Sequence, residues 1–273
     1  MALTEFQRGI CRLLAQARIE RGESYVAGGV ALNALIDSPR VSRDVDLFHD
    51  SDEALAVSWT ADRTLLEASG CSVTAIRERP GLVEADVARG TDMVLIQWAR
   101  DSAYRFFPLI QHADLGLTLH PFDLATNKVL ALVGRVEARD WVDVIECDER
   151  IQPLGYLAWS ACGKDPGLNP GMILDEARRT ARYSANEIAA LAFAGLPPGF
   201  ISLAAKWREM LKAAGEVISA LPAVASGTCV LDAELRLYTG GPSELKGAIE
   251  RRGLCFHAGS MGGSFPQIIE RPR

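Results

Sequence analysis

The sequence has no long apolar run, and this bounds where the protein can reside. None of its apolar stretches approaches the ~18 residues that a membrane-spanning helix requires. Residues 1–24 alternate apolar and charged side chains at helical spacing and lack the uninterrupted apolar segment of a signal peptide. We therefore expect a cytoplasmic protein without membrane association.

The chain also lacks paired cysteines. Its six cysteines are widely scattered, no two of them form a CxxC pair, and the four histidines show no zinc-finger spacing. Such a distribution is typical of free thiols in a reducing compartment. We expect neither a disulfide framework nor a zinc site, and we expect the histidines to be structural.

Positive charge is in deficit. The chain carries 29 Lys and Arg against 35 Asp and Glu, a formal net charge of −6. No global basic field attracts nucleic acid, so any contact with RNA would need a local basic patch.

The length of 273 residues is long for one compact domain and comfortable for two. The character of the sequence changes after Arg150, because residues 153–221 read as almost continuously helical. We predict a first domain at residues 1–150 and a mainly helical C-terminal domain at residues 151–273.

Within residues 1–150 the apolar periodicity alternates between helical and strand-like spacing. Predicted helices cover residues 4–20, 30–36, 52–69, 121–134 and 135–147. Predicted strands cover residues 25–27, 41–48, 71–77, 82–87, 92–98 and 117–120. No βαβ rhythm repeats, so we predict an α+β fold in which a mixed sheet is flanked by helices.

The residues most suited to chemistry lie between Ser24 and Asp50. Gly28-Gly29 follows a short predicted strand and precedes a helix, so its backbone amides can approach a phosphate. Asp44 and Asp46 lie two positions apart in a predicted strand, which places both carboxylates on one face. Neighbouring carboxylates repel unless a cation lies between them, and Mg²⁺ prefers such oxygen ligands, with Mn²⁺ as the alternative.

A cation completes this set further along the chain. Lys128 falls in a predicted helix that follows a strand, where a lysine can meet a phosphate. A phosphate cradle, a pair of metal ligands and a cation are the parts that phosphoryl or nucleotidyl transfer needs. Taken alone, Lys128 could equally be a surface lysine, and the charges of residues 135–140 could be surface pairs.

The order of these residues resembles a known family. The glycine pair, the segment RDVDLF and the run DLATNKVLALVGRVEARDWVDV are similar to those of the nucleotidyltransferase AbiEii/AbiGii toxin family. Its members are polymerase-β-like nucleotidyltransferases, and some are toxins of toxin–antitoxin or phage-defence systems. The resemblance covers roughly residues 20–150 and implies the polymerase-β-like nucleotidyltransferase fold for that part of the chain.

The resemblance also implies roles for single residues in the first part of the chain. Gly28 and Gly29 match the motif that binds the nucleotide phosphates. Ser42 and Arg43 lead into the aspartate pair and are expected at the nucleotide. Asp44 and Asp46 match the metal ligands.

Further roles follow from the later motif. Lys128 matches the lysine that contacts the nucleotide. Arg139, Asp140 and Asp143 fall in an RDxxD segment, which supplies a functional acidic residue in the family. We favour Asp140 over Asp143 for that role and expect Arg139 at the nucleotide.

One departure concerns a third carboxylate. Many polymerase-β-like enzymes place another Asp or Glu on a later strand, where it deprotonates the attacking hydroxyl or bridges two metals. The matching inward position is Gln97, whose amide is no base and is a weaker metal ligand than a carboxylate. Asp92 or Asp101 could replace it from the ends of the strand; otherwise the protein uses one metal, acts slowly or only binds nucleotide.

The expected activity is Mg²⁺-dependent transfer of a nucleoside monophosphate from an NTP to an acceptor hydroxyl. The acceptor would be tRNA, another RNA or a protein, and a cognate antitoxin protein would be a partner. Two alternatives stay open, a catalytically silent nucleotide-binding module and a transferase that acts on a small molecule of the antibiotic type. An acidic pocket in the helical half would favour the small molecule, because aminoglycosides are cationic.

Overall fold

The computed structural model describes residues 3–22, 24–180 and 182–267 and divides the chain into two compact units. Unit 1 comprises Met1–Ala103, Leu109–His120 and Ala192–Leu196. Unit 2 comprises Tyr104–Pro108, Pro121–Leu191 and Pro197–Arg273. The predicted domain boundary at residue 150 remains a prediction, and the main division between these two units falls near residue 120. The cause is that the two helices after residue 120 pack on the later helices of unit 2.

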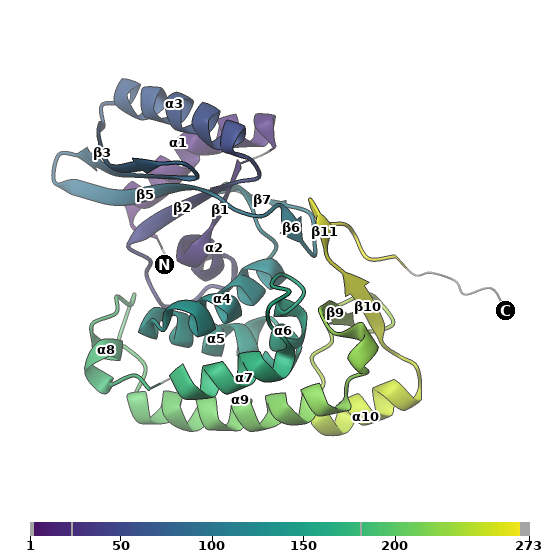
Figure 1. Ribbon diagram of the computed structural model, residues 1–273. Coiled ribbons are helices and arrows are strands. Elements are labelled where there is room, and N and C mark those ends of the chain that lie inside the picture. The colour runs from purple at the N-terminus through teal and green to yellow at the C-terminus, as the bar shows by residue number, and fades with distance from the viewer. Residues whose placement is uncertain (1–2, 23, 181, 268–273) are drawn as a thin grey trace. The chain divides into compact units, whose positions relative to one another are not determined.

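Unit 1 is built on a sheet that, within the described residues, has seven strands in the order β3-β4-β5-β2-β1-β8-β7 (Figure 1). Its strands are β1 Ser24–Ala27, β2 Asp44–His49, β3 Ser72–Arg79, β4 Leu82–Arg89, β5 Asp92–Arg100, β7 Ile110–His112 and β8 Gly116–Thr118. The sheet is mixed, because β2 pairs antiparallel with β1 and parallel with β5. The predicted mixed sheet flanked by helices is confirmed.

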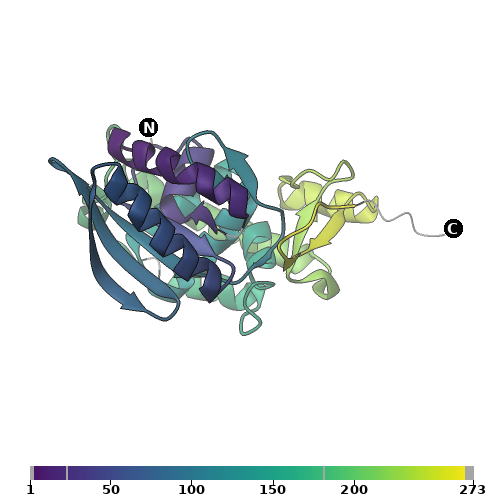
Figure 2. The ribbon, with the colours of Figure 1, turned by 90° about the horizontal axis from the view of Figure 1, so that it is seen from above.

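Three helices cover this sheet. Helices α1 Glu5–Arg21 and α3 Asp52–Ala68 lie side by side over one face, and α2 Gly28–Leu35 lies on the other (Figure 1 and Figure 2). The side chains of Thr4 and Ser51 accept backbone N–H groups at the starts of α1 and α3, which fixes where both helices begin.

The strands β2, β4 and β5 alternate buried and partly exposed residues. The buried set faces α1 and α3, where the Trp98 Nε1 donates to Asp62 Oδ2 over 2.8 Å. The Arg18 Nη2 also contacts Asp62 Oδ2 at 2.8 Å, and all three side chains are buried. The partly exposed set, which includes Asp44, Asp46 and Gln97, therefore lies on the face that carries α2.

Several predicted boundaries differ from those of the structure, and three of them bear on the site. The predicted helix 30–36 already begins at Gly28, and the predicted strand 41–48 begins only at Asp44. The predicted helix 135–147 begins at Ala138, because Val136 has a φ of 52° and interrupts the helical path.

Unit 2 is mainly helical, as expected for the C-terminal part. Its helices are α4 Pro121–Arg135, α5 Ala138–Arg150, α6 Leu154–Ala161, α7 Pro170–Thr180, α8 Ala185–Ala189, α9 Phe200–Ala220, the 3₁₀ turn Ala223–Ala225 and α10 Pro242–Glu250. Two small antiparallel pairs complete it, β9 Thr228–Leu231 with β10 Cys255–Ala258 and β6 Tyr104–Arg105 with β11 Ser260–Met261. Part of its core is a cluster of Tyr156, Trp159, Val217, Leu221, Val230 and Leu245.

Asp123 holds residues 104–108 to the rest of unit 2. Its fully buried carboxylate accepts the backbone N–H groups of Phe106 and Phe107 over 2.9 and 3.0 Å. The Lys164 Nζ lies 2.8 Å from Asp123 Oδ1 and compensates its charge.

In the described part of the chain, no helix is both long and apolar enough to cross a membrane.

Candidate active site

The two glycines at the start of α2 permit a close approach of backbone to side chains. Gly28 has a φ of 64°, and a Cβ atom there would lie 1.7 Å from the Asp46 Oδ2. A Cβ on Gly29 would lie 2.8 Å from the Ser42 Oγ. A side chain is therefore excluded at Gly28, whereas one at Gly29 would require the Ser42 and Arg40 side chains to shift. The absence of a side chain at Gly28 brings the start of α2 beside the Asp46 carboxylate.

Asp44 and Asp46 lie on one face of β2 and are both partly exposed. The buried Ser42 hydroxyl donates to Asp44 Oδ1 over 2.9 Å, and Gln7 Nε2 donates to the Ser42 carbonyl oxygen over 2.9 Å. Ser42 therefore orients one carboxylate of the pair. Arg43 points outward and is exposed.

Sequence reasoning missed two supporting residues of this site, Gln7 and Arg40. Both are buried polar side chains, and the Arg40 Nη2 would lie 2.7 Å from a Cβ on Gly29. Their contribution depends on long-range packing, and no spacing in the sequence indicates it.

The carboxylate pair fits a divalent metal ion that also binds a nucleotide. Mg²⁺ commonly takes one or two carboxylates from the protein and completes its shell with water and substrate phosphates. The described residues contain no cluster of three or more His, Cys, Asp or Glu side chains placed to hold a metal. Asp44 and Asp46 would thus supply the charged protein ligands, and the amides at Gly28 and Gly29 lie close enough to meet the phosphates of the same nucleotide.

The third carboxylate is absent from the position where we expected it. Gln97 on β5 is the direct neighbour of Asp46 on β2. Asp92 falls on the opposite face, in the alternation of Val94 and Trp98. Asp101 follows Gln97 by four residues, about 13 Å along the strand, and its N–H donates to the His49 carbonyl oxygen at the far end of β2. Neither aspartate replaces Gln97.

Lys128 and the RDxxD segment form a buried ionic cluster in unit 2. The Lys128 Nζ lies 2.9 Å from Asp140 Oδ1 and 2.8 Å from Asp143 Oδ2, and both carboxylates are fully buried. Arg135 also binds Asp140, with its Nε 2.8 Å from Oδ2. The cluster contains two cations and two carboxylates, so its members balance in charge.

The pKa of Asp140 reflects this pairing. Burial alone would raise the pKa, but the hydrogen bond from Arg135 and the charges of Lys128 and Arg135 outweigh burial and hold the pKa below its usual value. Asp140 therefore remains ionised. Arg139 contacts Glu137, with its Nε 2.7 Å from Glu137 Oε2.

The predicted site residues thus form two groups. Gly28, Gly29, Ser42, Asp44 and Asp46 are neighbours in unit 1, whereas Lys128 and Asp140 are direct partners in unit 2. The predicted catalytic, metal-binding and nucleotide-binding roles of all these residues, and of Arg43 and Arg139, remain predictions.

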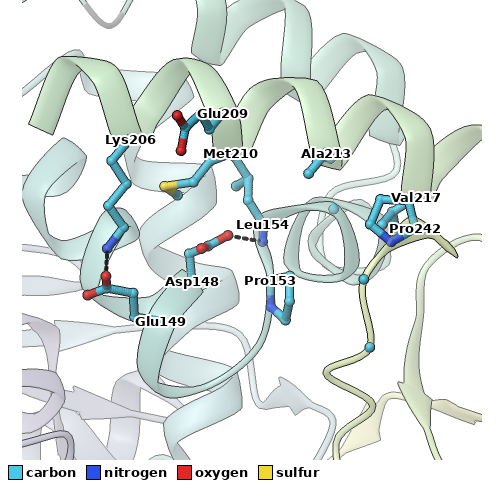
Figure 3. A pocket seen from close by; sticks show the side chains of 14 residues that line it. Asp148, Glu149, Pro153, Leu154, Lys206, Glu209, Met210, Ala213, Val217 and Pro242 are labelled. Atoms are coloured by element: carbon cyan, nitrogen blue, oxygen red, sulfur yellow. Dashed lines mark hydrogen bonds and ion pairs between the residues drawn. The ribbon is translucent and has the colours of Figure 1, made fainter. Parts of the chain in front are cut away.

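A separate hollow of about 390 Å³ lies within unit 2 (Figure 3). Asp148 and Glu149 line it from α5, and Lys206, Glu209 and Met210 line it from α9. Lys206 pairs with Glu149, and Asp148 accepts the Leu154 N–H over 2.7 Å. Burial raises the pKa of Asp148 above its usual value, although the Leu154 N–H partly opposes the shift. The hollow is therefore lined by three carboxylates, of Asp148, Glu149 and Glu209, and by the ammonium of Lys206.

Comparison with known proteins assigns this architecture to a class. No model of a known protein family matches the chain, and no curated protein matches its sequence. Solved structures do match, and they show that the chain has the fold of nucleotidyltransferases.

Two of these structures align over most of both chains. MenT4, a nucleotidyltransferase toxin from Mycobacterium tuberculosis H37Rv, matches with 17% identity and a TM-score of 0.53, covering 80% of this chain and 83% of that one. A candidate nucleotidyltransferase from H. pylori matches with 14% identity and a TM-score of 0.51, covering 81% of this chain and 99% of that one. The nucleotidyltransferase fold is thereby confirmed. Membership of the AbiEii/AbiGii family remains a prediction.

Proposed function

We propose that this protein is a nucleotidyltransferase that moves a nucleoside monophosphate from an NTP to an acceptor hydroxyl. The observation that carries the proposal is the contact of Gly28 with Asp46, on a nucleotidyltransferase fold. It places the start of α2, which can bind a phosphate, beside one of the two proposed metal ligands.

Each residue then has a defined task. The amides at Gly28 and Gly29 bind the β and γ phosphates. Ser42 orients the Asp44 carboxylate, so that it can bind the same metal ion as Asp46. A bound Mg²⁺ or Mn²⁺ would be held by Asp44 and Asp46 and would supply neutralisation of phosphate charge. The acceptor hydroxyl attacks the α phosphorus and loses its proton to solvent, the bond from the α phosphorus to the bridging oxygen breaks, and pyrophosphate leaves with that electron pair.

The ionic cluster in unit 2 has a supporting task in this proposal. Lys128 would contact the triphosphate, as the family resemblance implies. Its pairing with Asp140 and Asp143 supports a fixed ammonium position, and Asp140 would orient this cation. The same pairing lowers the charge that Lys128 offers to a phosphate, and Arg135, whose side chain is half exposed, offers a further cation.

The biological setting follows from the same likeness. MenT4 is a nucleotidyltransferase toxin. We propose that this protein is likewise the toxin of a cytoplasmic toxin–antitoxin or phage-defence system, with RNA, tRNA in particular, or a protein as acceptor and an antitoxin protein as partner.

The test is transfer of label from each α-labelled NTP, with Mg²⁺ or Mn²⁺, to total RNA or to a protein extract. We expect a labelled product, and we expect Asp44→Asn and Asp46→Asn each to reduce its formation by about 100-fold or more. Asp86→Asn is the matched control, because it removes a carboxylate from the same sheet face without touching the pair. Unchanged transfer in Asp44→Asn would overturn the proposal.

A silent nucleotide-binding module is the second candidate, and Gln97 beside Asp46 is the observation that favours it. Such a module would bind NTP and metal in calorimetry, with affinity that depends on Asp44, and would label no acceptor. The combination of tight binding with no transfer to RNA, protein or small molecules would select this candidate.

The acidic hollow of unit 2 supports a small cationic acceptor. Under this alternative, an aminoglycoside added to the labelling reaction becomes the labelled species. Glu209→Gln should raise the KM for the aminoglycoside and leave the KM for the NTP unchanged, because Glu209 lines the hollow and makes no ion pair with any residue in the described ranges. Equal effects on both constants would exclude the hollow as the acceptor site.

A further inference from the structure

A row of four polar side chains crosses the sheet of unit 1 from β2 to β3. Asp46 on β2 is the neighbour of Gln97 on β5, which is the neighbour of Glu84 on β4, which is the neighbour of Arg77 on β3. Cross-strand neighbours point to the same face of a sheet. The row therefore extends directly from the proposed metal ligands.

Gln97 is fixed in one orientation by this row. Its Nε2 donates to Glu84 Oε1 over 2.9 Å. A reversed amide would place its oxygen against the carboxylate, with repulsion in place of a hydrogen bond. Because Glu84 engages the nitrogen, Oε1 is the amide atom of Gln97 that is left for a cation, on a strand whose direct neighbour carries Asp46. Within the described ranges, no group donates a hydrogen bond to that oxygen.

A β-bulge in β3 pairs Arg77 with Glu84. The register between β3 and β4 shifts between Ala75 and Arg77, so Arg77 and not Ile76 stands opposite Glu84. The Arg77 Nη1 lies 3.2 Å from Glu84 Oε2. Bulges re-aim side chains in this way. Both carboxylate oxygens of Glu84 are thereby engaged, which leaves it a positioning group and not a metal ligand.

We propose that Gln97 supplies a neutral oxygen ligand to the divalent metal beside Asp46, and that Glu84 and Arg77 are positioning residues that hold its amide. This inference rests on the proposed function, since it adds a ligand to that metal site. The inference also predicts how tightly the site binds a metal ion with and without nucleotide. Two carboxylates and an amide carry one negative charge less than three carboxylates, so metal should bind weakly alone and more tightly together with a triphosphate.

The adjacent row of the same sheet provides a matched comparison. Asp44 on β2 neighbours Leu95 on β5, which neighbours Asp86 on β4. Asp86 thus stands as far from Asp44 in strand order as Glu84 stands from Asp46, but an apolar leucine separates them. Replacing Asp86 removes the same charge with no amide to reorient.

The test measures Mn²⁺ binding by electron paramagnetic resonance, with and without a non-hydrolysable NTP analogue. We expect Gln97→Leu and Glu84→Leu each to weaken Mn²⁺ binding by about tenfold. Asp86→Leu should change it by less than about twofold, since the carboxylate lies outside the row. Glu84→Gln should retain near-native Mn²⁺ binding, because the amide oxygen of the new glutamine can still accept the Gln97 N–H. Circular dichroism and thermal melting verify that each variant is folded.

A swap of the two residues separates ligation from structural support. In the double variant Glu84→Gln with Gln97→Glu, the hydrogen bond and the total charge are retained, but the carboxylate stands beside Asp46. We expect this variant to bind Mn²⁺ without nucleotide about tenfold or more tightly than the native protein. No gain would show that the side chain at position 97 does not reach the metal, and would overturn the inference.

The outcomes distinguish the two proposals. If Mn²⁺ binding requires Asp44 and Asp46 but Gln97→Leu matches the native protein, or Glu84→Leu matches Asp86→Leu, the inference about Gln97 is overturned and the proposed function stands. If Asp44→Asn and Asp46→Asn leave Mn²⁺ binding unchanged, the metal site itself, and with it the proposed function, fails.

Discussion

Gly28 shows how one residue can be restricted for two physical reasons at once. Its φ of 64° belongs to the left-handed region, and a Cβ atom there would overlap the Asp46 carboxylate at 1.7 Å from Oδ2. Gly90 has a φ of 63° but has open space around it. A comparison of Gly28 with Gly90 therefore separates the effect of backbone strain from the effect of steric overlap with Asp46.

We expect Gly90→Ala to lower the free energy of unfolding by about 1 kcal/mol, which is the cost of the left-handed conformation, and Gly28→Ala to lower it by more, because the new methyl group also overlaps Asp46. Only Gly28→Ala should abolish binding of an Mg²⁺·NTP analogue in calorimetry, because only there does the new methyl group displace Asp46. Equal loss of binding in the two variants would show that the contact with Asp46 has no role.

His49 is a second residue with a testable consequence. Its ring is buried, with Nε2 3.0 Å from the Ser24 Oγ and Nδ1 3.3 Å from the Ala99 carbonyl oxygen. Burial lowers the pKa of His49 from 6.5 to about 4, against the opposing effect of the bond to Ala99. The expectation that His49 is a structural histidine agrees with this environment.

Stability should therefore fall as the pH drops from about 6.5 toward 4. In that window the unfolded chain binds a proton at His49 and the folded protein does not, so protonation favours unfolding. The loss due to His49 between pH 7.5 and pH 5 is about 2 kcal/mol. Urea unfolding at the two pH values measures it, and His49→Gln should remove that part of the pH dependence. His112→Gln, at a partly exposed histidine, should retain it.

At the scale of elements, α4 and α5 are joined by their charged residues as much as by apolar packing. Lys128 on α4 is buried between Asp140 and Asp143 of α5. Truncating one member of a buried ion pair leaves a charge without compensation, which costs far more than the loss of an exposed pair. The arrangement makes Lys128 a determinant of stability, whether or not it contacts a nucleotide.

We expect Lys128→Met to lower the free energy of unfolding by about 3 kcal/mol or more in denaturant titration. Adding Asp143→Asn should recover part of the loss, because it neutralises one of the two carboxylates that Lys128 contacts, whereas Asp140 still pairs with Arg135. Arg150→Met, which breaks the exposed pair with Glu146, should cost less than about 1 kcal/mol. A Lys128→Met protein as stable as the native one would contradict the burial of this charge.

The elements also show where local patterns were informative. The alternation of Val45 and Leu47 with Asp44 and Asp46 predicts which face of β2 is polar, and the structure has this arrangement. The same pattern extended the strand back to residue 41, where the structure has no strand. There the Val41 N–H donates to the Ala192 carbonyl oxygen over 2.9 Å, and the Ala194 N–H donates to that of Pro39 over 2.8 Å. A partner some 150 residues away is invisible to local periodicity.

At the scale of the whole molecule, the chain returns to unit 1 after it has begun unit 2. Residues 192–196 belong to unit 1, and residues 104–108 belong to unit 2. Composition places a boundary where helical sequence begins, near residue 150. Contacts place it near residue 120, because α4 and α5 bury their apolar faces against helices of unit 2.

The sequence alone determined that Asp44 and Asp46 share one face, because the two-residue period of a strand is a local property of the backbone. It also determined that a glycine pair precedes a helix, and the order of motifs indicated the nucleotidyltransferase fold. Only the tertiary structure decided that Gly28 touches Asp46, that Gln97 is held by Glu84 and Arg77, and that Lys128 is buried between two carboxylates. These contacts depend on strand register, on a bulge and on helix packing, which are set by residues far apart in the chain.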